Sequence, residues 1–161
     1  MEAKMNQLLI KEMTEAYATE ILNWKYEAPY DFYDVEYSSA ALKELLENPY
    51  YAVINYSSEL VGFFCIGEPA QVPIGVQYGA YQDEFVDIGI GLKPELTGKG
   101  KGAAFLAFVI NHIQEKFHAP MRLTVATFNK RAIRLYEKFG FDKVVAFNSR
   151  GTEFITMVRE F

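Results

Sequence analysis

The sequence lacks the features that disulfide-bonded, membrane-spanning and secreted proteins require. It contains one cysteine, Cys65, in 161 residues, so an internal disulfide is excluded and a reducing compartment is expected. No apolar run approaches the roughly 18 residues of a membrane span. The first residues, MEAKMNQLLIKEM, also lack the charged and then apolar pattern of a signal peptide. We therefore expect a cytoplasmic protein with no membrane partner.

Positive charge is also scarce. The formal net charge is −5, which disfavours a general nucleic-acid-binding protein. Residues 1–60 hold 11 acidic and 4 basic side chains, whereas residues 61–161 hold 10 acidic and 12 basic ones, so the two parts carry −7 and +2. This asymmetry is compatible with ordinary surface variation. It is equally compatible with a cleft that has one acidic and one basic wall.

Apolar and aromatic residues are plentiful, at 50% and 16%, and the length indicates one domain, 1–161. Hydrophobic periodicity, turn residues and helix-capping residues predict the following elements. Strands are expected at 8–13, 50–56, 60–66, 84–92, 121–126, 141–148 and 152–161, and helices at 15–24, 38–47, 100–117 and 130–139. Hairpins near both ends exclude an all-parallel sheet. The predicted fold class is α/β (α+β), with a mixed, mostly antiparallel sheet of about seven strands flanked by about four helices.

The segment TGKGKG, residues 97–102, lies between an apolar strand and a long helix. Backbone N–H groups at the start of a helix are free to bind an anion, and glycines allow a phosphate to approach them closely. No Gly-Lys pair here is followed by Ser or Thr, as a P-loop requires, and the glycine spacing is not that of the dinucleotide fingerprint. An anion-binding loop and a simple glycine-rich turn both remain open at this point.

Two segments together resemble a known family, the GNAT family of N-acetyltransferases. Residues 86–113 are similar to its cofactor motif, a strand and a turn followed by Gln/Arg-x-x-Gly-x-Gly/Ala, with Thr97, Gly100 and Gly102 at the three defined positions. Thr97 departs from the usual Gln or Arg. Residues 123–141, LTVATFNKRAIRLYEKFGF, are similar to the family's following segment. The two motifs cover about 55 residues, and the predicted element order also agrees with the family.

The resemblance implies that acetyl-CoA is the cosubstrate. No metal is expected, because His112 and His118 are six positions apart on a predicted helix and fall on roughly opposite faces of it. The pantetheine arm would pair with the backbone of Ile90, Gly91 and Leu92, where Gly89 and Gly91 either leave room for a ligand or simply allow close packing. Asn129 would hydrogen-bond the same arm, although capping a helix explains this residue at least as well. The pyrophosphate would lie on the backbone N–H groups of the turn and the residues beside it, namely Thr97, Gly98, Lys99, Gly100, Lys101, Gly102 and Ala103.

The resemblance also implies roles in catalysis. Tyr136 matches the position of the family's frequent general acid, which would protonate the leaving thiolate. Considered locally, Tyr136 belongs to the apolar stripe of a helix. An amine must lose a proton before it attacks, and the candidate bases are Asp87, Glu84 or a chain of waters. Cys65 lies in an apolar strand pattern and is expected to be inert, so we expect direct attack in a ternary complex.

The loop at residues 23–37 corresponds to the region that shapes the acceptor site in this family. It combines aromatic rings with carboxylates, which suits a cation with an apolar body, although rings that pin the loop to the core would give the same pattern. The candidate substrate-binding residues are Trp24, Tyr26, Tyr30, Asp31, Tyr33 and Asp34. We expect an N-acetyltransferase, monomeric or homodimeric, that acts on a small-molecule or peptide amine. The alternative is a non-catalytic CoA- or anion-binding module.

Overall fold

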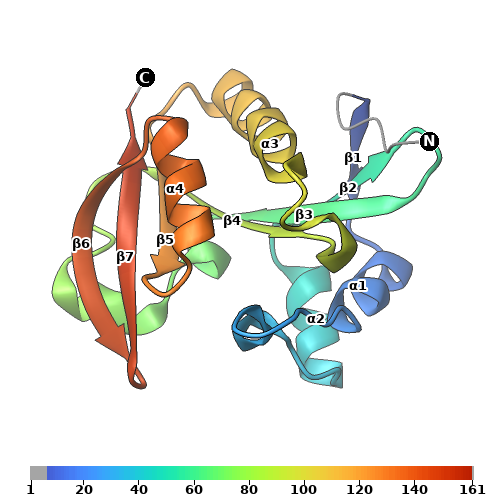
Figure 1. Cartoon of the computed structure of the whole chain (residues 1–161), viewed down its shortest axis with the longest axis horizontal. Coiled ribbons are helices and arrows are strands. Elements are labelled where there is room, and N and C mark those ends of the chain that lie inside the picture. The colour runs from blue at the N-terminus through green and yellow to red at the C-terminus, as the bar shows by residue number, and fades with distance from the viewer. Residues whose placement is uncertain (1–6, 161) are drawn as a thin grey trace. The chain divides into compact units, whose positions relative to one another are not determined.

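The computed structural model describes residues 7–160, which hold seven strands and four α-helices. The strands are β1 (Leu8–Glu12), β2 (Tyr50–Asn55), β3 (Leu60–Ile66), β4 (Val86–Leu92), β5 (Met121–Ala126), β6 (Asp142–Ser149) and β7 (Thr152–Arg159). The helices are α1 (Glu15–Leu22), α2 (Ser39–Glu47), α3 (Lys101–Phe117) and α4 (Lys130–Lys138). Hydrogen bonding orders the strands as β1-β2-β3-β4-β5-β7-β6 (Figure 1). The predicted element order is confirmed.

The sheet is mixed, as predicted. Antiparallel pairs join β1 to β2, β2 to β3, β5 to β7 and β6 to β7, whereas β4 and β5 run parallel. The parallel pairing covers only Val86 to Ile88 of β4, opposite Met121 to Leu123 of β5.

Three helices begin at a capping side chain. The Thr14 hydroxyl accepts a hydrogen bond from the Tyr17 N–H at 3.2 Å, and the Ser38 hydroxyl accepts one from the Ala41 N–H at 3.0 Å. The Asn129 side-chain oxygen accepts from the Ala132 N–H at 3.1 Å. Each cap provides a partner for a backbone donor that has none within its helix, which fixes where α1, α2 and α4 start.

The chain divides into two compact units. The first unit consists of the described residues up to Cys65 together with Ile90–Val109, and the second consists of Ile66–Gly89 and the described residues from Ile110 onward. The divisions fall within β4, after Gly89, and within α3, after Val109. Each unit has its own buried side chains and is described separately.

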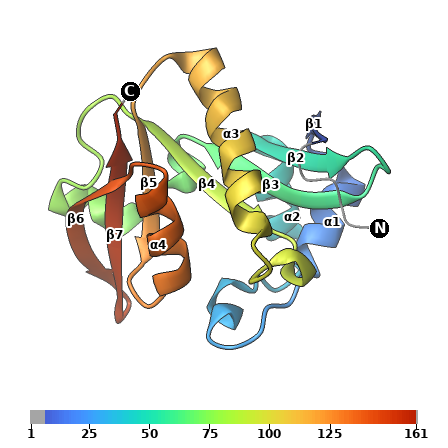
Figure 2. The same ribbon diagram turned by 45° about the horizontal axis from the view of Figure 1, so that its top comes forward.

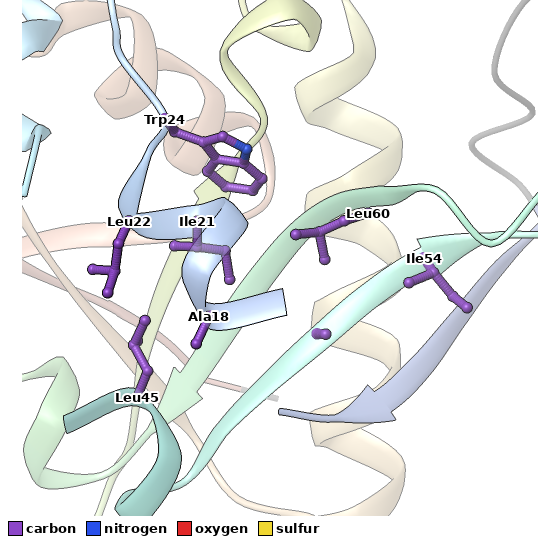
Figure 3. Close-up of a cluster of buried hydrophobic side chains, with 8 residues drawn as sticks. Ala18, Ile21, Leu22, Trp24, Leu45, Ile54 and Leu60 are labelled. Carbon is purple, nitrogen blue, oxygen red and sulfur yellow. The ribbon is translucent and has the colours of Figure 1, made fainter. Parts of the chain in front are cut away.

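In the first unit, apolar side chains of α1 and α2 pack on one face of β2 and β3. Figure 3 shows this cluster, whose buried members are Ala18, Ile21, Leu22, Trp24, Leu45, Ala52, Ile54 and Leu60. Phe63 of β3 packs against the same cluster. Its neighbour Gly62 faces the other way, because a Cβ atom built there would lie 2.5 Å from the Phe105 ring of α3. Helices therefore cover both faces of these strands, as the sequence predicts.

In the second unit, β5 lies between β4 and β7, and β6 and β7 form a long hairpin (Figure 2). The buried side chains include Met121, Leu123, Phe141 and Met157, each no more than 2% exposed. Helix α4 turns Ile133 and Tyr136 toward this core. The hairpin turn uses left-handed backbone at Arg150 and Gly151, with φ of 50° and 84°.

The structure differs from the sequence prediction mainly in short 3-10 helices. Segments expected to be irregular contain such helices at Tyr30–Tyr33, Glu68–Ala70 and Pro73–Tyr78. A further one, Pro94–Leu96, precedes the Gly/Lys turn. Single turns of this kind carry too few residues to produce a hydrophobic period, so pattern analysis has no means of detecting them.

Candidate functional site

The Gly/Lys turn forms the connection into α3. The Thr97 hydroxyl donates a hydrogen bond to the Pro94 carbonyl at 2.7 Å and so fixes the start of the turn. Gly98 and Gly100 have φ of 70° and 75°, a left-handed conformation that favours glycine. A Cβ atom built on Gly100 meets no heavy atom within 4 Å, so no side chain of the described residues fills the space beside it. Gly98, Lys99 and Gly100 are all exposed.

The charges around this turn favour an anion. Lys99 and Lys101 lie in the turn and in the first turn of α3, which contains no acidic residue. The 17-residue helix also presents its positive dipole end there. Left-handed glycines that expose consecutive N–H groups are the usual backbone cradle for a phosphate. The residues present therefore fit the diphosphate of a CoA cosubstrate.

Two aromatic side chains on the α1 and α2 side of the sheet, Phe63 and Tyr26, contact the end of β4. A Cβ atom on Gly91 would collide with the Phe63 ring, so the glycine is needed for close packing. Of the two explanations that the sequence leaves open for this glycine, packing is the one that the structure supports. The Tyr26 hydroxyl donates to the Leu92 carbonyl at 2.8 Å. This hydrogen bond ties the predicted substrate loop to the last residue of β4.

Tyr26 is also fixed through its backbone, because its N–H donates to the Asp34 carboxylate at 2.9 Å. Burial, followed by the charges of Asp34 and Glu95, raises the pKa of the Tyr26 phenol well above its usual range. The phenol therefore stays protonated and remains a hydrogen-bond donor. Of the six predicted substrate-binding residues, Tyr26 and Asp34 are directly joined to each other.

The remaining predicted substrate residues differ in exposure. Trp24 is buried in the apolar cluster, with 7% of its surface exposed. Asp31 and Tyr33 are exposed and Tyr30 is half-buried, and all three lie in the 3-10 helix Tyr30–Tyr33. The loop is thus anchored by Trp24 and Tyr26 and presents Asp31 and Tyr33 to solvent. The structure therefore supports the pinned-loop explanation for Trp24 and Tyr26, and cation binding by the exposed residues stays a prediction.

The second unit contains Asp87, one of the predicted bases. Its side chain is buried and forms a two-point ion pair with Arg122, at 2.7 Å from Nε to Oδ1 and 2.9 Å from the second nitrogen to Oδ2. Gln71 donates a third hydrogen bond to Oδ2 at 2.9 Å. A carboxylate engaged in this way has little capacity left to take a proton from a substrate. The geometry favours a structural role for Asp87 over the predicted role as base.

Arg122 is the residue that sequence analysis missed. Its third nitrogen donates to the Gln82 carbonyl at 2.7 Å, and its guanidinium lies over the rings of Tyr81 and Phe85 at 5.1 and 5.2 Å. The available signal was a lone cation within an apolar strand, MRLTVA. A buried arginine requires a partner, and a carboxylate on the neighbouring strand β4 is the natural one.

The other predicted catalytic residues also belong to the second unit. Glu84 is exposed, in the bend that precedes β4. Tyr136 is 8% exposed, and its ring lies 6.1 Å from that of Phe141. The side-chain oxygen of Asn129 caps α4, so the capping role that the sequence suggests is confirmed. The role of Asn129 toward pantetheine stays a prediction.

Among residues 7–160, no three His, Cys, Asp or Glu side chains come together as a metal site would require. No helix in the same range is long and apolar enough to cross a membrane.

Comparison with known proteins gives a consistent result. The model of the acetyltransferase (GNAT) family matches residues 15–141. An acetyltransferase of the GNAT family from Bacillus anthracis has a similar structure, with a TM-score of 0.72 and 13% identity over 96% of this chain and 95% of that one. A chimera of the spermidine N-acetyltransferase SpeG from Vibrio cholerae and hSSAT gives a TM-score of 0.71 and 20% identity, again over 96% and 95%.

Identities this low show a shared fold and leave the substrate open. Among curated protein sequences, none is similar enough to this chain to count as a match. The family model nevertheless covers most of the chain and includes both the Gly/Lys turn and the segment that carries Tyr136. The chain therefore belongs to the acetyltransferase (GNAT) family.

Proposed function

We propose that the protein transfers an acetyl group from acetyl-CoA to a primary amine of a small molecule or peptide, by direct attack in a ternary complex. The observation that carries the proposal is the Gly/Lys turn. It combines left-handed Gly98 and Gly100, open space beside Gly100 and the start of a long helix, within the region matched by the family model.

In this proposal the backbone N–H groups from Gly98 to Ala103 bind the diphosphate, and Lys99 and Lys101 add positive charge. The backbone of Ile90, Gly91 and Leu92 pairs with the pantetheine arm, and Asn129 adds a hydrogen bond to it. The cosubstrate supplies the acetyl group as a thioester. Tyr26 holds the Leu92 carbonyl at 2.8 Å and so limits the freedom of the strand end that binds the arm.

The chemistry requires a free amine, because an ammonium has no lone pair. An alkyl ammonium has a pKa of about 10.4, so a proton must be removed before or during attack. Glu84 is exposed and available for this role, directly or through water, whereas the oxygens of Asp87 are taken by Arg122 and Gln71. Attack forms the C–N bond and breaks the C–S bond, and the Tyr136 phenol gives its proton to the leaving thiolate.

For the amine substrate, we propose that the acidic and aromatic loop at residues 23–37 attracts the ammonium form. Asp31 is exposed there, and the first 60 residues carry a net −7. Structural neighbours that are named as spermidine N-acetyltransferases make a polyamine a sensible first compound to test. The similarity in fold does not by itself choose the amine.

The decisive experiment has two parts. Acetyl-CoA is expected to raise the melting temperature of the protein, and a panel of polyamines, amino sugars and peptides should then identify an amine that releases free CoA thiol. A thermal shift with no turnover across the panel would support the alternative, a non-catalytic CoA-binding module. No thermal shift at all would remove both proposals.

A further inference from the structure

The side chain of Trp24 is unusual among the buried groups of this protein. It lies in the apolar cluster of the first unit, 7% exposed, with its ring 6.0 Å from that of Phe63 (Figure 3). Its indole nitrogen, Nε1, has no hydrogen-bond partner and no contact with solvent. Across residues 7–160, it is the one buried side-chain nitrogen or oxygen in this state.

An orphaned donor of this kind needs an explanation. More than about nine in ten buried polar groups in proteins are satisfied, and leaving one unsatisfied is unfavourable. The indole N–H is a donor only, so rotation of the ring cannot convert it into an acceptor. A phenylalanine would occupy the cluster without this cost. In Figure 3 the nitrogen lies on the side of the ring that faces away from Ala18, Leu22 and Leu45.

The position of Trp24 links it to the proposed site. The Phe63 ring lies 6.0 Å from the Trp24 ring, and its edge atoms approach Gly91 of β4. Tyr26, two residues beyond Trp24, donates to the Leu92 carbonyl at 2.8 Å. Trp24 is therefore one side chain away from the strand end that we assign to the pantetheine arm, and it begins the loop that we assign to the amine substrate.

We propose that Trp24 Nε1 donates a hydrogen bond to an oxygen atom of the amine substrate, which must then carry a hydroxyl, ether or carbonyl group besides its amine. This inference rests on the proposed function. A second ammonium group cannot satisfy Nε1, because it has no lone pair and its charge is repelled by the positive end of the N–H dipole. The loop carboxylates attract the ammonium, and Trp24 selects the oxygen. Nε1 is covered in the free protein, so the proposal requires that binding moves the side chains over it.

The test uses the fact that Trp24 is the only tryptophan in the sequence, so intrinsic fluorescence reports on this site alone. The protein is titrated with three primary amines of matched length, whose far ends are a hydroxyl, a methyl and an amino group. The hydroxyl compound is expected to shift the emission maximum, and the methyl and amino compounds are not. Its kcat/KM should exceed that of the methyl compound by about fivefold to tenfold, as expected for one hydrogen bond.

Trp24→Phe removes the N–H and keeps an aromatic ring. This variant should lose the preference, so that its kcat/KM for the hydroxyl compound is no higher than that for the methyl compound, and a melting curve checks that the fold is kept. Tyr56→Phe is the matched control, since Tyr56 is 66% exposed on the turn after β2. It should leave the preference intact.

Equal kcat/KM values for the three amines in the wild type, or an undiminished preference in Trp24→Phe, would overturn the inference and leave the proposed function standing. The same holds if the emission maximum responds to no amine, in which case Nε1 is satisfied by an ordered water only. If no amine is acetylated at all, the proposed function fails instead. The fluorescence titration needs no turnover and still decides the inference.

Discussion

A single side chain, Arg122, connects several parts of the second unit. It pairs with Asp87 on β4, donates to the Gln82 carbonyl and lies over two aromatic rings, and it is only 3% exposed. Removing one partner of a buried pair leaves the other charge without compensation. Asp87→Asn and Arg122→Met should therefore each lower the free energy of unfolding by about 3–5 kcal/mol, measured by urea denaturation.

The partly exposed ion pair between Lys93 and Glu95 provides the control. Its atoms are 3.7 Å apart and the Glu95 side chain is 67% exposed, so Glu95→Gln should cost less than about 1 kcal/mol. The double variant Asp87→Leu with Arg122→Met should recover much of the loss, because no buried charge then remains. Wild-type stability in either single variant at the buried pair would show that water or a local shift compensates the remaining charge.

Tyr136 has two interpretations that one substitution can separate. If it is the general acid, Tyr136→Phe should reduce kcat by about a hundredfold or more, with the KM for acetyl-CoA unchanged. If it is only a core residue, the phenyl ring fills the same buried space on α4 and kcat is unchanged. Steady-state kinetics together with a melting curve distinguish a loss of chemistry from a loss of fold.

At the scale of elements, the Gly/Lys turn has a close counterpart elsewhere in the chain. Gly100 and Gly151 have φ of 75° and 84°, and a Cβ atom built on either meets nothing within 4 Å. Substitution by alanine should therefore impose a similar backbone cost at both positions, about 1–2 kcal/mol. Gly100→Ala should also reduce the rise in melting temperature that acetyl-CoA produces, because a methyl group then stands where the diphosphate is proposed to approach.

Gly151→Ala, in the hairpin turn between β6 and β7, should lose similar stability and keep the full acetyl-CoA shift. An equal shift in both variants would mean that the space beside Gly100 is not used by the diphosphate. For each variant, the melting temperature without acetyl-CoA is subtracted from that with acetyl-CoA. Backbone strain is present in both measurements, so it cancels in this difference.

Most elements could be predicted from local sequence, because each carries its own signal. Thr14, Ser38 and Asn129 mark helix starts, and the apolar period of residues 100–117 identifies α3. The family motifs located the Gly/Lys turn. What could not be predicted depends on register between strands. The Asp87–Arg122 pair forms because these two residues are opposite each other on β4 and β5, and a single sequence does not state that alignment.

Gly91 illustrates the same limit. Its place in the motif is visible in the sequence, but the reason for a glycine is the Phe63 ring of β3, about thirty positions earlier. Trp24 is a further case. An aromatic residue in a loop is predicted easily, whereas an indole nitrogen left without a partner is a property of packing.

At the scale of the whole molecule, the uneven distribution of charge is the main feature left to explain. The first 60 residues carry −7 and the remaining residues +2. An anionic cosubstrate and a cationic amine would each be attracted by the part of opposite sign. The attraction acts through solvent and so weakens with salt, over a Debye length of about 8 Å at physiological ionic strength.

Asp31→Asn with Asp34→Asn tests this explanation without disturbing the loop. The Tyr26 N–H donates to Oδ1 of Asp34, and asparagine keeps an oxygen there, so the anchor of the loop survives. The KM for the acetylated amine should rise by about twofold to fivefold per carboxylate removed, and its dependence on salt should flatten. Asp142→Asn with Glu153→Gln changes the net charge equally at exposed positions of the second unit and should leave that KM unchanged. If both double variants raise the KM by the same factor, the effect belongs to net charge, and the loop has no specific part in attracting the amine.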